Sequence, residues 1–171
     1  NFEINSKSPV FIIAELSANH NGSLETAIET VRAAKRAGAN CIKLQTYTAD
    51  TITIDSPKDD FLIKGTIWQG KNLYQLYQEA YTPWEWHKAL FDRANEKGIF
   101  CFSTPFDDTA VDFLEELEMP VYKIASFENI SPINSLISLS ITAKISRLIP
   151  KDLPTPSRVM MALKITNHSR G

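Results

Sequence analysis

The 171-residue sequence lacks several features that mark specialised classes of protein. No apolar run approaches the ~18 residues of a membrane-spanning helix, and positions 1–8 lack the apolar core of a secretory signal. The net charge is -2 and no basic stripe with interleaved aromatic residues occurs, so a nucleic-acid-binding surface is not expected. The only cysteines, Cys41 and Cys101, lie within predicted strands, where we expect buried free thiols. These absences favour a cytoplasmic protein that binds neither membranes nor nucleic acids.

The last quarter of the sequence has few or none of the aromatic, glycine and acidic residues found in the rest. Aromatic residues end at Phe127, and no glycine occurs between Gly98 and Gly171. Residues 1–129 hold 19 acidic and 12 basic residues, whereas residues 130–171 hold one acidic residue and six basic ones. This change predicts a boundary near residue 129, with a folded part before it and an atypical tail after it.

Within the first 126 residues, apolar runs alternate with amphipathic segments. A continuous apolar run at 10–16 predicts a strand buried on both faces. Further strands are expected at 40–45, 99–103 and 121–126, and helices at 23–37, 83–97 and 107–117. This β-α-β-α-β-α-β order predicts a parallel sheet with right-handed crossovers. The long connection from Thr46 to Thr82, with a short helix near 73–80, is typical of a functional loop.

All four predicted strands end in polar residues. A flavodoxin-like sheet also collects polar groups at strand ends, but it concentrates them at one switch point. Because every strand contributes here, we favour an α/β fold that forms the N-terminal half of a TIM (β/α)8 barrel, with four parallel strands and their helices.

The strand-end residues indicate a binding site for an anion. Lys43 and Lys123 offer two cations, and Thr104 and Ser126 offer hydroxyl donors, which together suit a phosphorylated or doubly anionic ligand. Glu15 beside them could orient a substrate hydroxyl or act as an acid or base. A single lysine at a strand end is more often a surface cation, and it is the pair that favours a site.

Other polar and aromatic residues carry weaker predictions. The three histidines are scattered, so no metal site is expected among them: His20 lies in a predicted turn, His87 on a helix and His168 in the tail. A group of aromatic residues in and after the long connection could line a sugar site or pack that connection onto the barrel: Trp68, Tyr74, Tyr77, Tyr81, Trp84 and Trp86.

Four motifs at the strand ends together resemble the NeuB-type sialic acid synthase family. They occur in order over residues 10–128, which makes the resemblance specific. Two further features, Phe127-Glu128 and the segment 61–87, are more similar to its pseudaminic acid synthase branch. The four motifs are FIIAELSANHNG at 11–22, CIKLQT at 41–46, FSTPFD at 102–107 and YKIAS at 122–126.

The resemblance implies a metal-assisted transferase reaction. Phosphoenolpyruvate would condense with an open-chain N-acetylated amino sugar, a 2,4-diacetamido-trideoxy hexose in this branch, to give a nonulosonic acid such as pseudaminic acid and phosphate. An N-acetylneuraminate or legionaminate synthase is the alternative. By family position Glu15 would be catalytic, and the substrate-binding residues would be Lys43, Gln45, Thr104, Phe106, Lys123, Ser126 and Glu128.

The resemblance also implies parts that residues 130–171 do not supply. The family's metal-binding histidines lie in the second half of the barrel, so no metal ligand is expected here, although the full-length enzyme would use Mn²⁺ or Mg²⁺ and relatives would be homodimers. We therefore expect an incomplete, inactive chain with a frameshifted, truncated or disordered tail; an unusual genuine ending is the alternative. A non-catalytic half-barrel and another phosphoenolpyruvate-using barrel are the competing hypotheses.

Overall fold

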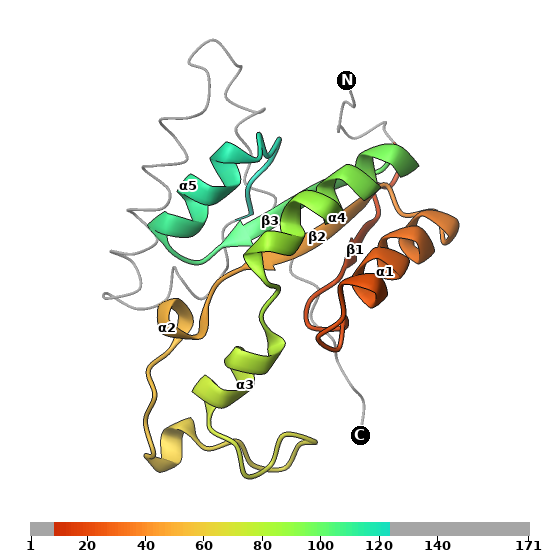
Figure 1. Ribbon diagram of the computed structural model, residues 1–171. Coiled ribbons are helices and arrows are strands. Elements are labelled where there is room, and N and C mark those ends of the chain that lie inside the picture. The colour runs from red at the N-terminus through yellow and green to blue at the C-terminus, as the bar shows by residue number, and fades with distance from the viewer. Residues whose placement is uncertain (1–8, 124–171) are drawn as a thin grey trace.

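The computed structural model describes residues 9–123 and shows a three-stranded sheet with helices (Figure 1). The strands are β1 (Ile13–Glu15), β2 (Cys41–Thr46) and β3 (Phe100–Pro105), and they pair in the order β1-β2-β3. Both pairs are parallel, as the alternating sequence pattern predicted. The helices are α1 (Leu24–Arg36), α2 (Ala49–Ile52), α3 (Leu73–Ala80), α4 (Trp84–Lys97) and α5 (Asp108–Glu116), with a 3-10 turn η1 (Asp59–Phe61).

The fourth predicted strand, 121–126, is only begun in the described part of the chain. Tyr122 forms a single parallel bridge with Ser103, and the Lys123 N–H donates to the Ser103 carbonyl at 3.3 Å. Residues 124–126 lie outside the described residues, as does the tail at 130–171. The described residues therefore contain three strands rather than the four expected.

The prediction that 10–16 forms a strand buried on both faces is wrong. β1 has only three residues, Val10 is 83% exposed and Ile12 is 50% exposed. Its one described neighbour is β2, so β1 is an edge strand within residues 9–123. A continuous apolar run identifies a strand of a parallel sheet, but it cannot tell which of its residues will be covered.

The local signals that begin and end the helices are confirmed. The Ser23 hydroxyl accepts a hydrogen bond from the Thr26 N–H at the start of α1, and Gly38 follows the helix at φ +87. Gly98 ends α4 in the left-handed region, where glycine has no steric penalty. The Asp107 carboxylate caps α5 by accepting from the N–H groups of Thr109 and Ala110.

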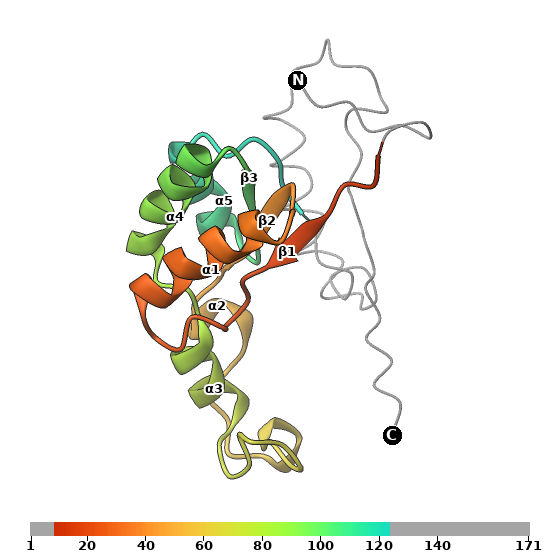
Figure 2. The same cartoon turned by 90° about the vertical axis from the view of Figure 1, so that its right-hand side faces the viewer.

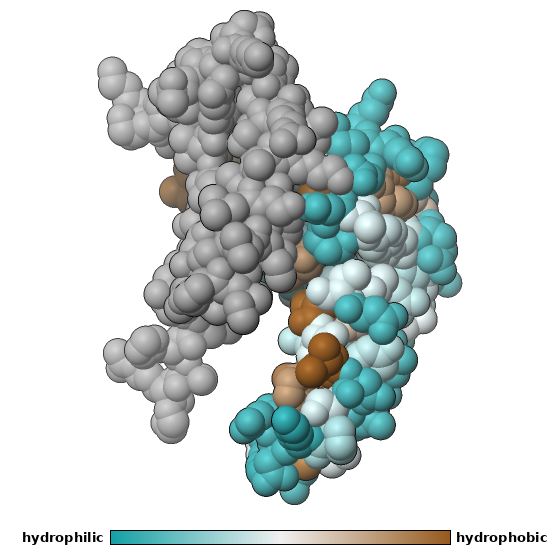
Figure 3. Space-filling model, turned by 90° about the vertical axis from the view of Figure 1, so that its left-hand side faces the viewer, coloured by the Kyte–Doolittle hydropathy of each residue, from teal (hydrophilic) through white to brown (hydrophobic). Residues whose placement is uncertain are grey.

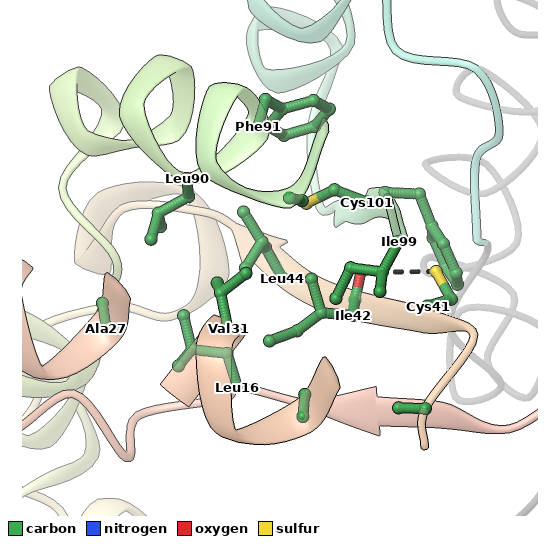
Figure 4. Packing of buried hydrophobic residues seen from close by; sticks show 14 of the residues in the cluster. Leu16, Ala27, Val31, Cys41, Ile42, Leu44, Leu90, Phe91, Ile99 and Cys101 are labelled. Atoms are coloured by element: carbon green, nitrogen blue, oxygen red, sulfur yellow. Dashed lines mark hydrogen bonds between the residues drawn. The ribbon is translucent and has the colours of Figure 1, made fainter. Parts of the chain in front are cut away.

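The hydrophobic core lies between the sheet and the helices. Figure 2 shows α1, α4 and α5 on one side of the strands. Ile42 and Leu44 of β2 lie beside Val31 of α1 and Leu90 of α4, and all four are fully buried (Figure 4). Because side chains alternate along a strand, Lys43 and Gln45 must lie on the other face.

The connection between β2 and α4, residues 47–82, extends from the carboxyl end of the sheet and holds α2, η1 and α3. The sequence pattern near 73–80 predicted α3 with its observed bounds, whereas α2 and η1 are single turns that were not predicted. On the face shown in Figure 3, apolar residues lie scattered among hydrophilic ones. Ile54 and Ile67 of the connection are 64% and 93% exposed. Among residues 9–123, no helix has the length and apolar character needed to cross a membrane.

Candidate active site

Strand register brings four of the eight predicted site residues to one face of the sheet. Glu15 is paired with Lys43 across β1 and β2, and Gln45 is paired with Thr104 across β2 and β3. In a parallel sheet, paired residues project to the same face, and so do residues two apart along one strand. These four residues therefore share the face opposite α1 and α4, at the carboxyl ends of the strands. In an α/β barrel that end of the sheet carries the active site.

Glu15 and Lys43 form an ion pair at this face. Lys43 Nζ lies 2.5 Å from Glu15 Oε1, and the exposed fractions of the two side chains are 6% for Lys43 and 45% for Glu15. A buried ammonium needs a counter-charge, because removing it from water is costly. The partly exposed carboxylate supplies that charge and can still turn toward solvent.

Thr104 carries a buried hydroxyl with no hydrogen-bond partner among the described residues. The residue is 2% exposed, and its Oγ1 is one of four buried side-chain polar atoms in residues 9–123 that lack a partner. Leaving such a group unpaired typically costs about 1–3 kcal/mol. An oxygen that accepted a hydrogen bond from this hydroxyl would remove that cost.

The other predicted substrate-binding residues have different surroundings. The bridge between Tyr122 and Ser103 puts Lys123 level with Thr104. Phe106 is 8% exposed and packs edge-on against Tyr47, with ring centroids 5.6 Å apart. Ser126 and Glu128 lie outside the described residues. The structure thus groups Glu15, Lys43, Gln45 and Thr104 and places Phe106 in a neighbouring apolar cluster.

The opposite face of the same strand ends holds a buried polar chain that sequence analysis missed. Thr46 Oγ1 lies 2.7 Å from Ser103 Oγ and 2.9 Å from His87 Nε2. His87 Nδ1 lies 3.2 Å from the Pro83 carbonyl, and the histidine is fully buried. Burial lowers the pKa of His87 to about 4, so the ring is neutral at pH 7. The sequence indicated only a histidine on a helix, and nothing in it linked His87 to two strands.

The aromatic residues proposed for a sugar site divide into two groups. Tyr74 and Tyr81 line a cleft of about 270 Å³ between α2 and α3, together with Thr48, Asp50 and Gln78. The Tyr74 hydroxyl donates to Asp50 at 2.7 Å, which raises the pKa of Tyr74. The other four pack against neighbours: Tyr77 on Tyr47, Trp84 on Phe113, Trp86 on His20, and Trp68 under the Lys71 ammonium.

The described residues do not provide a metal centre. No group of three or more His, Cys, Asp or Glu side chains within residues 9–123 could hold an ion.

His20, which the sequence placed in a turn, is 1% exposed, and its Nδ1 accepts from the Gly22 N–H. Burial lowers its pKa, and the Ala80 carbonyl partly offsets that effect. Cys41 and Cys101 are buried free thiols, as predicted, and burial raises the pKa of Cys41 to about 12.

Comparison with known proteins supplies the family. Residues 30–145 match the NeuB family. The chain is 55% identical to the pseudaminic acid synthase of Campylobacter jejuni over 124 residues, which are 72% of this chain and 36% of that protein. It is 52% identical to the pseudaminic acid synthase of Helicobacter pylori, over 70% of this chain and 35% of that one. The chain thus spans about a third of the length of these relatives.

A solved structure agrees with the sequence matches. The crystal structure of N-acetylneuraminic acid synthetase from Leptospira borgpetersenii, in complex with citrate, superposes with a TM-score of 0.58 at 28% identity. The superposition covers 81% of this chain and 52% of that one. Both the family resemblance and its pseudaminic acid synthase branch are therefore confirmed, and the chain belongs to the NeuB family.

Proposed function

We propose that the strand ends of this chain bind phosphoenolpyruvate for condensation with an N-acetylated amino sugar, giving a nonulosonic acid and phosphate. The observation that carries the proposal is a buried lysine and a buried, unpartnered threonine hydroxyl on one face at the carboxyl end of a parallel sheet. A cation and a free donor suit a small, densely charged anion better than a neutral ligand. The pseudaminic acid synthases named above support this choice of reaction.

Each group has a defined task in this proposal. Lys43 provides the counter-charge for the phosphate or carboxylate, and the Thr104 hydroxyl donates to one of its oxygens. Lys123, level with Thr104, adds a second cation, and Ser126 a second hydroxyl. When the anion approaches, Lys43 exchanges its contact with Glu15 for a contact with the ligand.

Glu15 is the proposed catalytic group. Its release from Lys43 leaves a carboxylate at the reacting centre, where it can orient a substrate hydroxyl or the attacking water. In the reaction, C3 of phosphoenolpyruvate forms a bond to the aldehyde carbon of the sugar, and the aldehyde oxygen gains a proton. The C2=C3 electron pair supplies that bond and leaves C2 electron-deficient, so water adds to C2 and releases a proton to solvent. The adduct loses phosphate by cleavage of the C2–O bond, and the remaining C2 hydroxyl becomes the keto oxygen as its proton is released.

The sugar would lie on the side of Gln45, with Phe106 as an apolar wall and Glu128 contributing a carboxylate. The sugar we propose is a 2,4-diacetamido-trideoxy hexose, because the pseudaminic acid synthases match this chain at 52–55% identity and a diacetyllegionaminic acid synthase of Legionella pneumophila at 37%. The family's divalent metal has no ligand set among residues 9–123, so no step is assigned to it here.

Binding of phosphoenolpyruvate to the 171-residue chain tests the first part of the proposal. Calorimetric titration is expected to show binding that Lys43→Met weakens by about 10- to 100-fold, because a charged hydrogen bond contributes about 1.5–3 kcal/mol. Lys88→Met is the matched control, since the Lys88 side chain on α4 is 73% exposed and pairs only with Asp92 among the contacts described. Equal effects of the two substitutions would contradict the proposed site.

Turnover tests the second part. The chain is incubated with phosphoenolpyruvate, Mn²⁺ and the diacetamido hexose, and phosphate release is followed, with N-acetylmannosamine as the competing sugar. Faster release with the diacetamido hexose supports the pseudaminic reaction. Faster release with N-acetylmannosamine supports the N-acetylneuraminate alternative. Binding without turnover supports a non-catalytic chain.

A further inference from the structure

A buried hydrogen-bond chain lies directly behind the proposed anion site. Thr46 follows Gln45 in β2, and Ser103 precedes Thr104 in β3, so each site residue has a neighbour that projects to the helix-facing side. The side chains of Thr46, Ser103 and His87 are joined there at 2.7 and 2.9 Å, and all three residues are completely buried. These two hydrogen bonds thus link the ends of β2 and β3 to each other and to α4.

One anchor fixes the direction of this chain. The Pro83 carbonyl can only accept, so His87 Nδ1 must carry the proton that it donates at 3.2 Å. Because the ring is neutral, Nε2 then has no proton and accepts from the Thr46 hydroxyl. The Thr46 oxygen is left to accept from the Ser103 hydroxyl. Each donor and acceptor therefore has one role, and removing any member leaves a buried polar group unpaired.

A second hydrogen bond from the start of α4 lies at the base of the 47–82 connection. The Trp84 Nε1–H donates to the Tyr47 carbonyl at 3.3 Å, and Tyr47 directly follows Thr46, the partner of His87. The connection therefore begins and ends at two hydrogen bonds between the start of α4 and the end of β2. A shift of His87 would move the strand ends and the base of the connection together.

We propose that His87 is a positioning residue that holds the ends of β2 and β3 in the register that places Thr104 for binding the anion and Gln45 beside it on the sugar side. The inference rests on the proposed function and extends it to a residue on the opposite face of the sheet. His87 does not contact the substrate. It acts through Thr46 and Ser103, whose backbones are continuous with those of the two binding residues.

The test compares variants that break the hydrogen-bond chain with one that only weakens the core. Phosphoenolpyruvate affinity is measured by titration at matched folded fraction for the wild-type chain, His87→Leu, Thr46→Val, their double variant, His87→Gln and Leu90→Ala. Leu90→Ala is the matched control, because Leu90 is a fully buried residue of the same helix that belongs to the apolar cluster. Glutamine keeps an acceptor near the position of Nε2 and is the conservative rescue.

The expected pattern is specific to positioning. His87→Leu and Thr46→Val each weaken binding about tenfold, and the double variant binds no more weakly than either single one, because all three break one link. The affinities of His87→Gln and Leu90→Ala for phosphoenolpyruvate stay within about threefold of the wild-type value, a smaller change than the loss of one hydrogen bond would cause. If Leu90→Ala weakens binding as much as His87→Leu, or His87→Leu leaves it unchanged, the positioning role is overturned.

A second measurement separates this inference from the proposed function. Backbone amide shifts of Gln45 and Thr104 are recorded for ¹⁵N-labelled wild type, His87→Leu and Leu90→Ala without ligand. If both amides shift strongly in His87→Leu and not in Leu90→Ala, the result supports positioning of the strand ends. This outcome does not depend on ligand binding, so it holds even if the wild-type chain fails to bind phosphoenolpyruvate and the proposed function fails. Unshifted amides in His87→Leu overturn it whatever the affinity.

Discussion

Glu15→Gln gives the sharpest prediction of the proposed function, because the substitution should tighten anion binding while it removes the proposed catalytic carboxylate. The Glu15 carboxylate is paired with the Lys43 ammonium at 2.5 Å. An anionic ligand must therefore share the ammonium with Glu15 or displace Glu15 from it. Glutamine has the same shape and still accepts a hydrogen bond from the ammonium, but it carries no charge. The repulsion between the Glu15 carboxylate and an incoming anion is therefore removed without loss of packing.

The size of the effect follows from charge and exposure. Two unit charges about 5 Å apart repel by about 3 kcal/mol at an effective dielectric constant near 20. Because the Glu15 side chain is 45% exposed, water screens much of this repulsion. About 1 kcal/mol remains, which corresponds to about fivefold tighter binding.

The assay is calorimetric titration of the chain with phosphoenolpyruvate and with inorganic phosphate, at low and at physiological ionic strength. The gain in affinity should shrink as salt rises, because the repulsion is electrostatic. Phosphate release in the turnover assay should fall by about 100-fold or more if Glu15 handles a proton. Glu25→Gln, in the exposed first turn of α1, removes the same charge outside the site and should change neither. Unchanged or weaker anion binding in Glu15→Gln at both ionic strengths would refute the reasoning.

Three further predictions concern folding. The pKa of His87 is about 4 in the folded chain and about 6.5 when unfolded, so the unfolded chain binds the extra proton between these values and stability falls as pH drops through them. In urea unfolding, the free energy of unfolding of the wild-type chain should fall by about 2 kcal/mol from this cause between pH 7 and pH 5. His87→Gln should lack this contribution, and the same pH dependence in both proteins would contradict a neutral buried ring. Gly98→Ala should cost about 1 kcal/mol in the same assay because Gly98 has φ +62, whereas Gly98→Asn should cost less, and the reverse order would rule out backbone strain as the cause. Ser23→Ala should lower the free energy of unfolding by about 1 kcal/mol, whereas Ser23→Asp should preserve it; a drop with aspartate as well would show that the cap is not responsible.

The sequence was sufficient for the parts of the fold that local signals determine. Ser23, Gly38, Pro83 and Gly98 set helix ends through backbone geometry that depends on a few neighbouring residues, and all four were predicted. The parallel order followed from the alternation of strands and helices. The length and burial of β1 depend on what covers each residue, which a run of apolar letters does not encode.

The candidate site was predictable to a similar degree. Parallel strands end at one edge of a sheet, so the convergence of Lys43, Gln45 and Thr104 followed from the strand assignments alone. Their partners did not follow. The ion pair of Lys43 with Glu15, and the link from His87 to Thr46, depend on side chains 28 and 41 residues apart in the sequence. The first contact requires the pairing of β1 with β2, and the second requires the packing of α4 against the sheet.

The two hydrogen bonds at the base of the 47–82 connection have a consequence for how such proteins can diverge. The connection leaves the end of β2 and returns to the start of α4 at adjacent points, and it makes internal contacts of its own, such as the hydrogen bond from Asn72 to Asp55 at 2.9 Å. Its length and composition can therefore change without disturbing the strands beneath it. In evolutionary terms, substitutions and insertions between Tyr47 and Trp84 can accumulate while the two hydrogen bonds at the base keep the strand ends in place.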